Sequence, residues 1–341
     1  MEGYLSLSSF LGLRTEVVGL DIGQHSVRVA QLKRPRQHSR LVSLGIAELP
    51  KKTLEKGTIA NPDALIETIK SALQNATPHR ITAKTLVAAL PEIYIFSKVI
   101  QMPNLPPNEL QKAIPFETSQ FIPMPIDEMY IDYTPLALHP DKQQIDVAIF
   151  AAPKQMVDSL IDITNQAGFE LSALETKSTA ITRSLLPAGS TDAIQIIEIG
   201  SESTRMTISD HGNVWLTTSL NIGEAQLLKT IGEKLNQPEN EVRDYLSNHK
   251  SSSIDSVVSS AVAPIVQEAV SANRFHETRD YQADKIKRAI LVGQGSTIPG
   301  IIPAVVGSMH IQCEPGLPLV TGTTEVNLQY AVSLGLSMRP Y

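Results

Sequence analysis

Residues 18–29 read VGLDIGQHSVRV, and residues 195–206 read QIIEIGSESTRM. Both stretches fit the pattern acid-Ile-Gly-x-x-Ser-x-Arg, and the second copy follows the first at a constant offset of 177 residues. Self-similarity of this kind predicts a duplicated structural unit, and the alternative is two unrelated turns that match by chance. The aligned pairs are Asp21 with Glu198, Gly23 with Gly200, Ser26 with Ser203, and Arg28 with Arg205.

Each copy is typical of a β-hairpin, because an apolar run precedes the glycine and a more alternating run follows it. A glycine at the turn lets a ligand approach the backbone, and the N–H groups and hydroxyls of such a turn can bind phosphate oxygens. A carboxylate at the strand end suits Mg²⁺ held through water beside phosphates. Two facing hairpins would therefore hold the phosphates of a nucleotide from both sides. The predicted phosphate-binding residues are Gly23, Gln24, His25, Ser26, Arg28, Gly200, Ser201, Ser203 and Thr204, and the predicted Mg²⁺-binding residues are Asp21 and Glu198.

A third motif, AILVGQGSTIPG, covers residues 289–300. Its short apolar run indicates a buried strand, and the glycines that follow would let a base and ribose lie close to the backbone. Alone this signal is weak, because many strand-to-helix turns in α/β proteins are rich in glycine. As the last of three ordered motifs it predicts contacts to the nucleoside from Gly293, Gly295 and Ser296.

The order of these motifs resembles the actin-like ATPase superfamily, which includes actin, the large heat-shock chaperones, sugar kinases and FtsA. Within that superfamily the chain is similar to the PilM family of type IV pilus assembly proteins, and the resemblance covers about residues 15–338. The stretches that carry it are residues 19–32, 121–128 and 291–300. The stretch at 121–128, FIPMPIDE, is the one that narrows the resemblance from the superfamily to the family.

This resemblance implies an α/β, actin-like ATPase fold, in which two duplicated RNase H-like lobes surround a nucleotide cleft and carry an inserted αβ subdomain. It implies ATP and Mg²⁺ as ligands, with Gly223 among the nucleotide-binding residues and Glu224 and Arg243 near the adenine ring. Some relatives have an acid that orients the attacking water, and Glu175 is the candidate here, although an acid at a helix N-terminus also stabilises the helix dipole. The expected divisions are a first lobe over 1–83, an inserted subdomain over 84–175, a bridging helix in 176–194, a second lobe over 195–324 and a C-terminal helix in 325–341.

Several positions depart from the family's pattern. Family members usually have serines where this chain has Gln24 and His25, and a lysine where it has Arg28. The second acid is Glu198 where aspartate is usual, and Gln294 stands where glycine is usual. These exchanges keep the general chemistry but change the reach of the groups around the phosphates. We therefore expect nucleotide binding with slow or no hydrolysis of ATP.

Composition narrows the range of functions. The chain has 29 Lys plus Arg against 35 Asp plus Glu, and its net charge of −6 argues against a nucleic-acid partner. A single cysteine, Cys313, excludes an intrachain disulfide and any site with several thiolate ligands. No stretch approaches the roughly 18 apolar residues of a membrane span. We expect a cytoplasmic protein.

The resemblance also implies partners. In PilM relatives the inserted subdomain forms a groove for the short cytoplasmic N-terminal tail of PilN, a membrane protein with a single span. Strand edges and apolar helix faces suit such an extended peptide. We therefore expect a PilN-like peptide and other pilus platform and motor components as partners, and a location at the cytoplasmic face of the inner membrane through them. Self-association into a homo-oligomer stays open.

Two other functions of the superfamily compete with this interpretation. A division or filament protein similar to FtsA would end in a basic amphipathic helix, whereas this chain ends in LGLSMRPY. A small-molecule kinase would need a general base beside the hairpins, and no motif near residues 18–29 or 195–206 supplies one.

Overall fold

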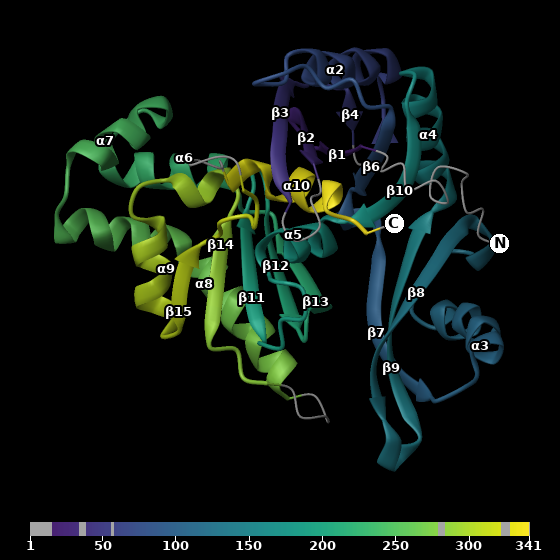
Figure 1. Cartoon of the computed structure of the whole chain (residues 1–341). Coiled ribbons are helices and arrows are strands. Elements are labelled where there is room, and N and C mark those ends of the chain that lie inside the picture. Colours follow the sequence, from purple (N-terminus) through teal and green to yellow (C-terminus); the bar gives the residue numbers. More distant parts are fainter. Residues whose placement is uncertain (1–15, 34–38, 56–57, 279–283, 322–327, 341) are drawn as a thin grey trace.

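The computed structural model describes residues 16–340 apart from 34–38, 56–57, 279–283 and 322–327. Two five-stranded sheets form the centre of the molecule, and a third, smaller sheet extends from one side (Figure 1). Within the described residues no helix is long and apolar enough to cross a membrane.

The first sheet has the strand order β10-β6-β1-β2-β3. Strands β1, β2 and β3 form an antiparallel meander, and β6 and β10 are added parallel to β1. All six residues of β1 are buried, as expected for a strand that helices cover on both faces. The bounds are β1 Val17–Ile22, β2 Ser26–Lys33, β3 Arg40–Glu48, β6 Thr85–Leu90 and β10 Glu170–Thr176. A small two-stranded ribbon, β4 Leu54–Glu55 with β5 Thr58–Ile59, follows β3.

The second sheet repeats this topology, with the order β13-β12-β11-β14-β15 and the same pattern of antiparallel and parallel neighbours. The expected duplication is therefore confirmed. Each copy of the motif forms the same hairpin, because Asp21 pairs in register with Arg28, and Glu198 with Arg205. The bounds are β11 Ile194–Ile199, β12 Thr204–Asp210, β13 Asn213–Leu220, β14 Arg288–Val292 and β15 Gln312–Pro315.

Two helices, α5 (Lys177–Leu185) and α10 (Ala331–Ser337), lie between the two sheets (Figure 1). One apolar cluster joins their buried residues to β1 and β6 on one side and to β11 and β14 on the other. The packing leaves no room for side chains at two glycines. A Cβ on Gly19 would lie 1.9 Å from the Ser333 carbonyl oxygen, and one on Gly335 would lie 1.8 Å from the Ala180 carbonyl oxygen.

The outer faces of the sheets carry the remaining helices of the two lobes. On the first sheet α2 (Pro62–Gln74) and α4 (Lys154–Gln166) bury their apolar residues against β1, β2 and β6. Asn61 caps α2, as its side chain accepts a hydrogen bond from the Ala64 amide. Four helices cover the second sheet and complete its own core, namely α6 Glu224–Leu235, α7 Val242–Asn248, α8 Ser252–Glu277 and α9 Ile301–Met309.

The inserted subdomain is an antiparallel sheet in the order β7-β9-β8 with one helix packed on it. The expected hairpin forms as β8 and β9. Leu110 and Ile114 of the helix meet Met102, Val147 and Ile149 in a separate small core. The bounds are β7 Phe96–Pro103, α3 Pro107–Ser119, β8 Met129–His139 and β9 Gln144–Pro153.

The expected domain boundaries need a correction. Strand β6, helix α4 and strand β10 fall within the block 84–175 that we expected to be inserted, yet all three belong to the first lobe. The insertion itself covers about residues 91–153. The reason is that a buried apolar run does not reveal which sheet it joins, and β6 and β10 pair parallel with the first lobe's strands. The C-terminal helix is also shorter than expected, since α10 begins at Ala331 and residues 322–327 lie outside the described part.

Candidate functional site

A cavity of about 630 Å³ lies between the turns of the two duplicated hairpins. Equivalent residues of the first and the second hairpin line this cavity, and residues of the turn after β14 line it as well. Eleven of the residues predicted from the three motifs line this cavity: Asp21, Gly23, Gln24, His25, Ser26, Arg28, Glu198, Gly200, Ser201, Ser203 and Gly293. The duplicated sequence therefore converges on one shared cavity.

The two hairpin turns have the same geometry. The Gly23 amide donates to the Ser26 carbonyl at 2.9 Å, and the Gly200 amide donates to the Ser203 carbonyl at 2.9 Å. A Cβ on either glycine would crowd the same carbonyl oxygen, at 3.1 Å and 3.0 Å respectively. Tight turns of this kind present backbone N–H groups that can bind phosphate oxygens.

Each hairpin also carries an acid and an arginine on neighbouring strands. The Arg28 guanidinium lies 3.9 Å from the Asp21 carboxylate, and Arg205 donates a hydrogen bond to Glu198. These pairs follow from the strand register, because the acid and the arginine are directly opposite each other in both hairpins. The floor of the cavity thus has two equivalent ion pairs.

Lys177 adds a further cation beside Asp21. Its Nζ lies 2.6 Å from Asp21 Oδ1 and donates to the Ile22 carbonyl at 3.1 Å. Burial alone would raise the pKa of Asp21, but the charges of Lys177, Arg28 and Arg205 outweigh it and hold that pKa below its usual value. Asp21, only 4% exposed, is therefore a buried carboxylate that its cationic neighbours keep ionised.

Two contacts reach across this cavity to the second lobe, one from the inserted subdomain and one from the first lobe. Glu92, in the short helical turn Glu92–Tyr94 after β6, lies 2.7 Å from the Arg205 Nε of the second lobe. His25 Nε2 at one hairpin tip lies 3.0 Å from Glu202 Oε1 at the other. In the part of the chain that the structure describes, each acid lining the cavity lies against a cation or an imidazole.

The structure does not bring five other predicted residues to the cavity wall: Thr204, Gly223, Glu224, Gly295 and Ser296. They lie behind it and support it. The Glu224 amide donates to the Gly200 carbonyl at 2.8 Å, so the start of α6 holds the second hairpin turn in place. Gly223 fits there because a Cβ would lie 2.5 Å from the Glu202 backbone.

The turn after β14 is held in a similar way. Ser296 Oγ donates to the Gly293 carbonyl at 2.7 Å, and a Cβ on Gly295 would lie 2.3 Å from the side chain of Ile199. Arg243 contacts Glu224 and donates to Thr297 Oγ1 at 3.3 Å. Arg243 therefore joins the turn after β14 to Glu224 at the start of α6, outside the cavity.

Glu175 lies in a different place from the one expected for a residue that orients water. Its two carboxylate oxygens accept hydrogen bonds from Arg183 at 2.7 and 2.9 Å. One of them also accepts a hydrogen bond from Arg339 at 2.5 Å. It lines a second cavity and not the one between the hairpins. A carboxylate with these partners, on the other side of β10, does not reach the hairpin turns. Glu175 is therefore not placed to orient a water molecule there.

Sequence reasoning missed three charged residues of the site: Lys177, Arg205 and Glu92. Arg205 could have been found, because it is the aligned partner of Arg28 in the duplicated motif. Lys177 and Glu92 carry no local signal. They follow the ends of β10 and β6, and only the parallel addition of these strands beside β1 brings both to the cavity.

The second cavity has a volume of about 690 Å³ and lies where the inserted subdomain meets both lobes. Strands β8 and β9 form one wall, and β10, α5 and the turn between β12 and β13 form the rest. Both β8 and β10 are edge strands of their sheets. Apolar side chains from several of these elements line it, including Ile131, Phe150, Leu174, Leu186 and Val214.

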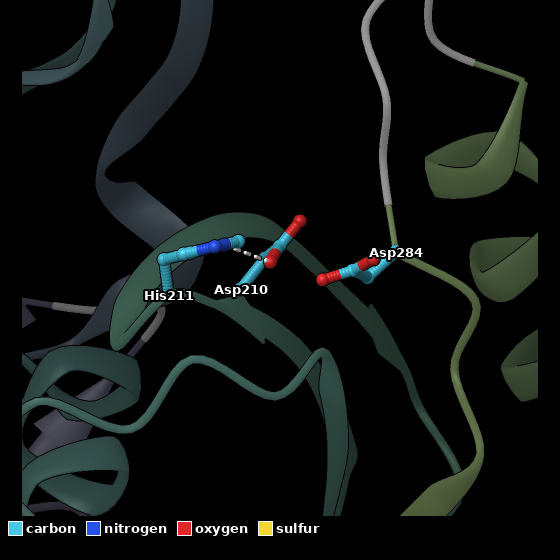
Figure 2. A group of neighbouring side chains, drawn as sticks. All are labelled: Asp210, His211 and Asp284. Atoms are coloured by element: carbon cyan, nitrogen blue, oxygen red, sulfur yellow. Dashed lines mark hydrogen bonds and ion pairs between the residues drawn. The ribbon is translucent and has the colours of Figure 1, made fainter.

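A further charged group lies at the β12–β13 turn (Figure 2). Asp210, His211 and Asp284 have side-chain ligand atoms within 4.8 Å of one another, and Asp284 approaches from the segment before β14. Asp210 is buried and both of its oxygens face imidazoles, with His211 Nδ1 at 2.7 Å and His276 Nε2 at 3.3 Å. This arrangement joins the turn to α8 through hydrogen bonds between Asp210 and the two histidines.

The donor set of the first cavity can be compared with the ligands that its motifs predict. Two glycine turns and the cations Arg28, Lys177 and Arg205 fit an anionic, phosphate-bearing ligand. Its volume lies within the range of about 300–1,000 Å³ that is usual for small-molecule sites. The same residues do not fit Mg²⁺, because Asp21 and Glu198, the predicted Mg²⁺ ligands, already contact protein cations.

Known proteins resemble this chain in sequence and in fold. The family model of the type IV pilus assembly protein PilM matches residues 19–339. A chain of the PilM–PilN type IV pilus biogenesis complex superposes with a TM-score of 0.79 at 22% identity, covering 95% of this chain and 98% of that one.

Two other solved structures share the fold. The ethanolamine utilization protein EutJ from Carboxydothermus hydrogenoformans has a TM-score of 0.55 at 11% identity, over 95% of this chain and 90% of that one. MreB5 of Spiroplasma citri bound to AMPPNP has a TM-score of 0.56 at 12% identity, over 94% of each chain. These similarities establish the actin-like α/β fold.

Proposed function

Because the chain belongs to the PilM family of type IV pilus assembly proteins, we propose that it serves pilus assembly as an ATP-binding scaffold. Its first cavity takes the nucleotide. Its second cavity takes the cytoplasmic N-terminal peptide of a PilN-like membrane protein, which holds the chain at the cytoplasmic face of the inner membrane. Other platform and motor components then meet it there.

The main support for nucleotide binding is that the two hairpin turns line the same cavity. Gly23 and Gly200 line it from opposite lobes, and the arginine of each hairpin lies at its floor. A ligand that contacts both turns favours the arrangement in which they face each other, because it binds that arrangement better than an open one. The fold shared with MreB5, solved with AMPPNP, supports the same assignment.

Hydrolysis of ATP is slow or absent in this proposal. An acid that activates water or a substrate hydroxyl needs a free carboxylate in reach of the reacting group. Among the described residues, the acids at this cavity are engaged by Lys177, Arg28, Arg205 or His25. The same observation disfavours a small-molecule kinase.

The second cavity supports the peptide part. It is bordered by two edge strands, β8 and β10, which can receive an extended peptide through backbone hydrogen bonds. Its apolar lining suits aliphatic side chains, and Arg183 and Arg339 line it as well. The similarity to a chain of the PilM–PilN complex agrees with this choice of partner.

The nucleotide part is tested at Ser201, which lies at the second turn and lines the cavity. A carboxylate at this position would repel phosphate, so Ser201→Asp should weaken ATP binding at least about tenfold in isothermal titration calorimetry. Ser201→Asn has nearly the same shape without the charge, and should retain affinity within about threefold. Equal affinity of the aspartate variant and the wild type would contradict the proposal.

A further inference from the structure

Lys177 occupies the position beside Asp21 where the sequence predicts Mg²⁺. It is the first residue of α5, and its Nζ lies 2.6 Å from Asp21 Oδ1. The Lys177 side chain is 13% exposed, and its Nζ also donates to the Ile22 carbonyl. The ammonium is thus anchored by two acceptors inside the first lobe.

Among the described residues, the charged groups that act on Asp21 are cations. Arg28 approaches from β2, Lys177 from α5, and Arg205 acts on it from β12 of the other lobe. The second predicted metal ligand, Glu198, contacts Arg205. Both carboxylates that would hold Mg²⁺ therefore already contact cationic side chains of this chain.

A hydrated Mg²⁺ does not fit this arrangement. The ion keeps most of its waters and needs carboxylates that can accept hydrogen bonds from them. Placing it beside Asp21 would bring a doubly charged ion next to the Lys177 ammonium. Moving Lys177 away would leave a largely buried ammonium without its carboxylate, which is strongly unfavourable.

The same contacts suit a metal-free polyphosphate. A carboxylate at the floor of the cavity would repel phosphate oxygens unless a positive charge stands between them. Lys177 supplies that charge at Asp21, and Arg205 supplies it at Glu198. A lysine ammonium is a compact point charge with three donors, so it can contact a phosphate oxygen while it stays paired with Asp21.

We propose that this cleft binds the polyphosphate of a nucleotide without a divalent metal, with Lys177 taking the charge-screening role of the metal beside Asp21. This inference rests on the proposed ATP-binding function and specifies how the site meets the phosphates. It makes Lys177 a residue that determines metal dependence and not a catalytic residue.

The test is calorimetric titration of the full chain with ATP, in buffer with EDTA and in buffer with excess Mg²⁺. The wild type should bind ATP in both buffers with affinities within about threefold of each other. In Lys177→Gln the Asp21 carboxylate loses its nearest cation, so removal of Mg²⁺ should weaken binding at least about tenfold.

Two further variants separate charge from structure. Adding Asp21→Asn to Lys177→Gln removes the carboxylate that Lys177 no longer screens. The affinity for ATP should then again be similar with and without Mg²⁺. Lys177→Arg keeps the positive charge, so its affinity for ATP should remain similar in the two buffers. Lys229→Gln on the exposed face of α6 is the matched control for loss of a lysine, and should change neither affinity.

The outcomes divide clearly. ATP binding by the wild type only in the presence of Mg²⁺ overturns this inference and leaves the proposed function intact. If Lys177→Gln loses the same affinity for ATP in both buffers, this inference is also overturned. That result is expected of a lysine that only supports the structure of the site. No ATP binding in either buffer refutes the proposed function and this inference with it.

Discussion

Glu175 and Lys177 are two residues apart in the sequence, yet their side chains serve different cavities. Glu175 is near the end of β10 and points to Arg183 and Arg339, whereas Lys177 begins α5 and points to Asp21. The change from strand to helix between them turns the chain, so neighbours in sequence face opposite sides of the first lobe. This local geometry separates the second cavity from the first.

The first prediction concerns Glu175. Replacing it by Gln removes the charge that pairs with Arg183 and Arg339, whose side chains are partly exposed. Chemical denaturation should show a free energy of unfolding lower by about 1–2 kcal/mol, below the value for a fully buried pair. ATP affinity should stay as in the wild type. A folded Gln variant with clearly weakened ATP binding would mean that Glu175 does act at the first cavity.

At the residue scale, the sequence predicted what short local patterns encode. The hairpin glycines, the acids and Arg28 all reach the cavity, because a two-strand hairpin fixes their positions from within a dozen residues. Lys177 and Glu92 could not be predicted in this way, because their contact with the site depends on which strands pair in the sheet. The ion pair of Asp21 with Lys177 was unpredictable for the same reason, since Lys177 comes from far along the chain.

Among the elements, α10 packs closely against α5 and β1. Its backbone touches α5 at Gly335 and β1 at Ser333, with no space for a Cβ at Gly335 or at the facing Gly19. These contacts tie the C-terminal helix to the first lobe's central strand and to the bridging helix. The sequence predicted a final apolar helix, but not how closely it approaches its neighbours.

Gly335→Ala is the second prediction. The new methyl group would meet the Ala180 carbonyl at 1.8 Å, so backbones must shift and the free energy of unfolding should fall by at least about 2 kcal/mol. Gly307→Ala in α9 is the matched control, because nothing lies within 4 Å of its added Cβ. Alanine there should stabilise the helix by about 0.5–1 kcal/mol. Similar effects of the two substitutions in urea denaturation would refute the packing described here.

The β12–β13 turn gives a prediction about pH. Burial opposes ionisation of Asp210, but hydrogen bonds from His276 and His211 outweigh it and hold its pKa below the usual value of about 3.9. A carboxyl whose pKa is lowered on folding stabilises the native state above its unfolded pKa, and this contribution is lost as pH falls through the folded pKa.

Asp210→Asn should therefore be less stable than the wild type at pH 7. The difference in melting temperature should shrink as the pH falls below about 4, because the wild-type carboxyl then becomes protonated as well. Thermal melts of both proteins across pH 7 to 3 measure this. A difference that stays constant, or grows, towards pH 3 would show that ionisation of Asp210 does not stabilise the turn.

On the scale of the whole molecule, the duplicated topology was predictable and the extent of the insertion was not. The sequence repeat predicts two sheets with the same strand order. It also predicts that the hairpins of the two sheets are structurally equivalent. The assignment of β6, α4 and β10 to the first lobe depends on parallel pairing and on packing between distant segments. Those interactions leave no signature in a local apolar pattern.

The arrangement of the inserted subdomain against both lobes leads to the fourth prediction. Thr134 is an exposed residue on the edge strand β8 and lines the second cavity, so Thr134→Arg would fill part of the peptide site. Fluorescence anisotropy with a labelled N-terminal peptide of the PilN-like partner should show binding weakened at least about tenfold.

The control for this prediction is Gln120→Arg, which adds the same side chain at an exposed position of the same subdomain outside the cavity. It should leave peptide affinity unchanged, and both variants should keep wild-type affinity for ATP. Peptide binding that is insensitive to Thr134→Arg would place the partner elsewhere on the molecule.

The central claim is that the two hairpin turns hold one polyphosphate between them. A crystal structure of the full chain grown with AMPPNP tests it most directly. We expect the phosphates to lie between Gly23 and Gly200, in contact with backbone N–H groups of both turns. A nucleotide that contacts only one turn, or that lies outside the 630 Å³ cavity, would contradict it.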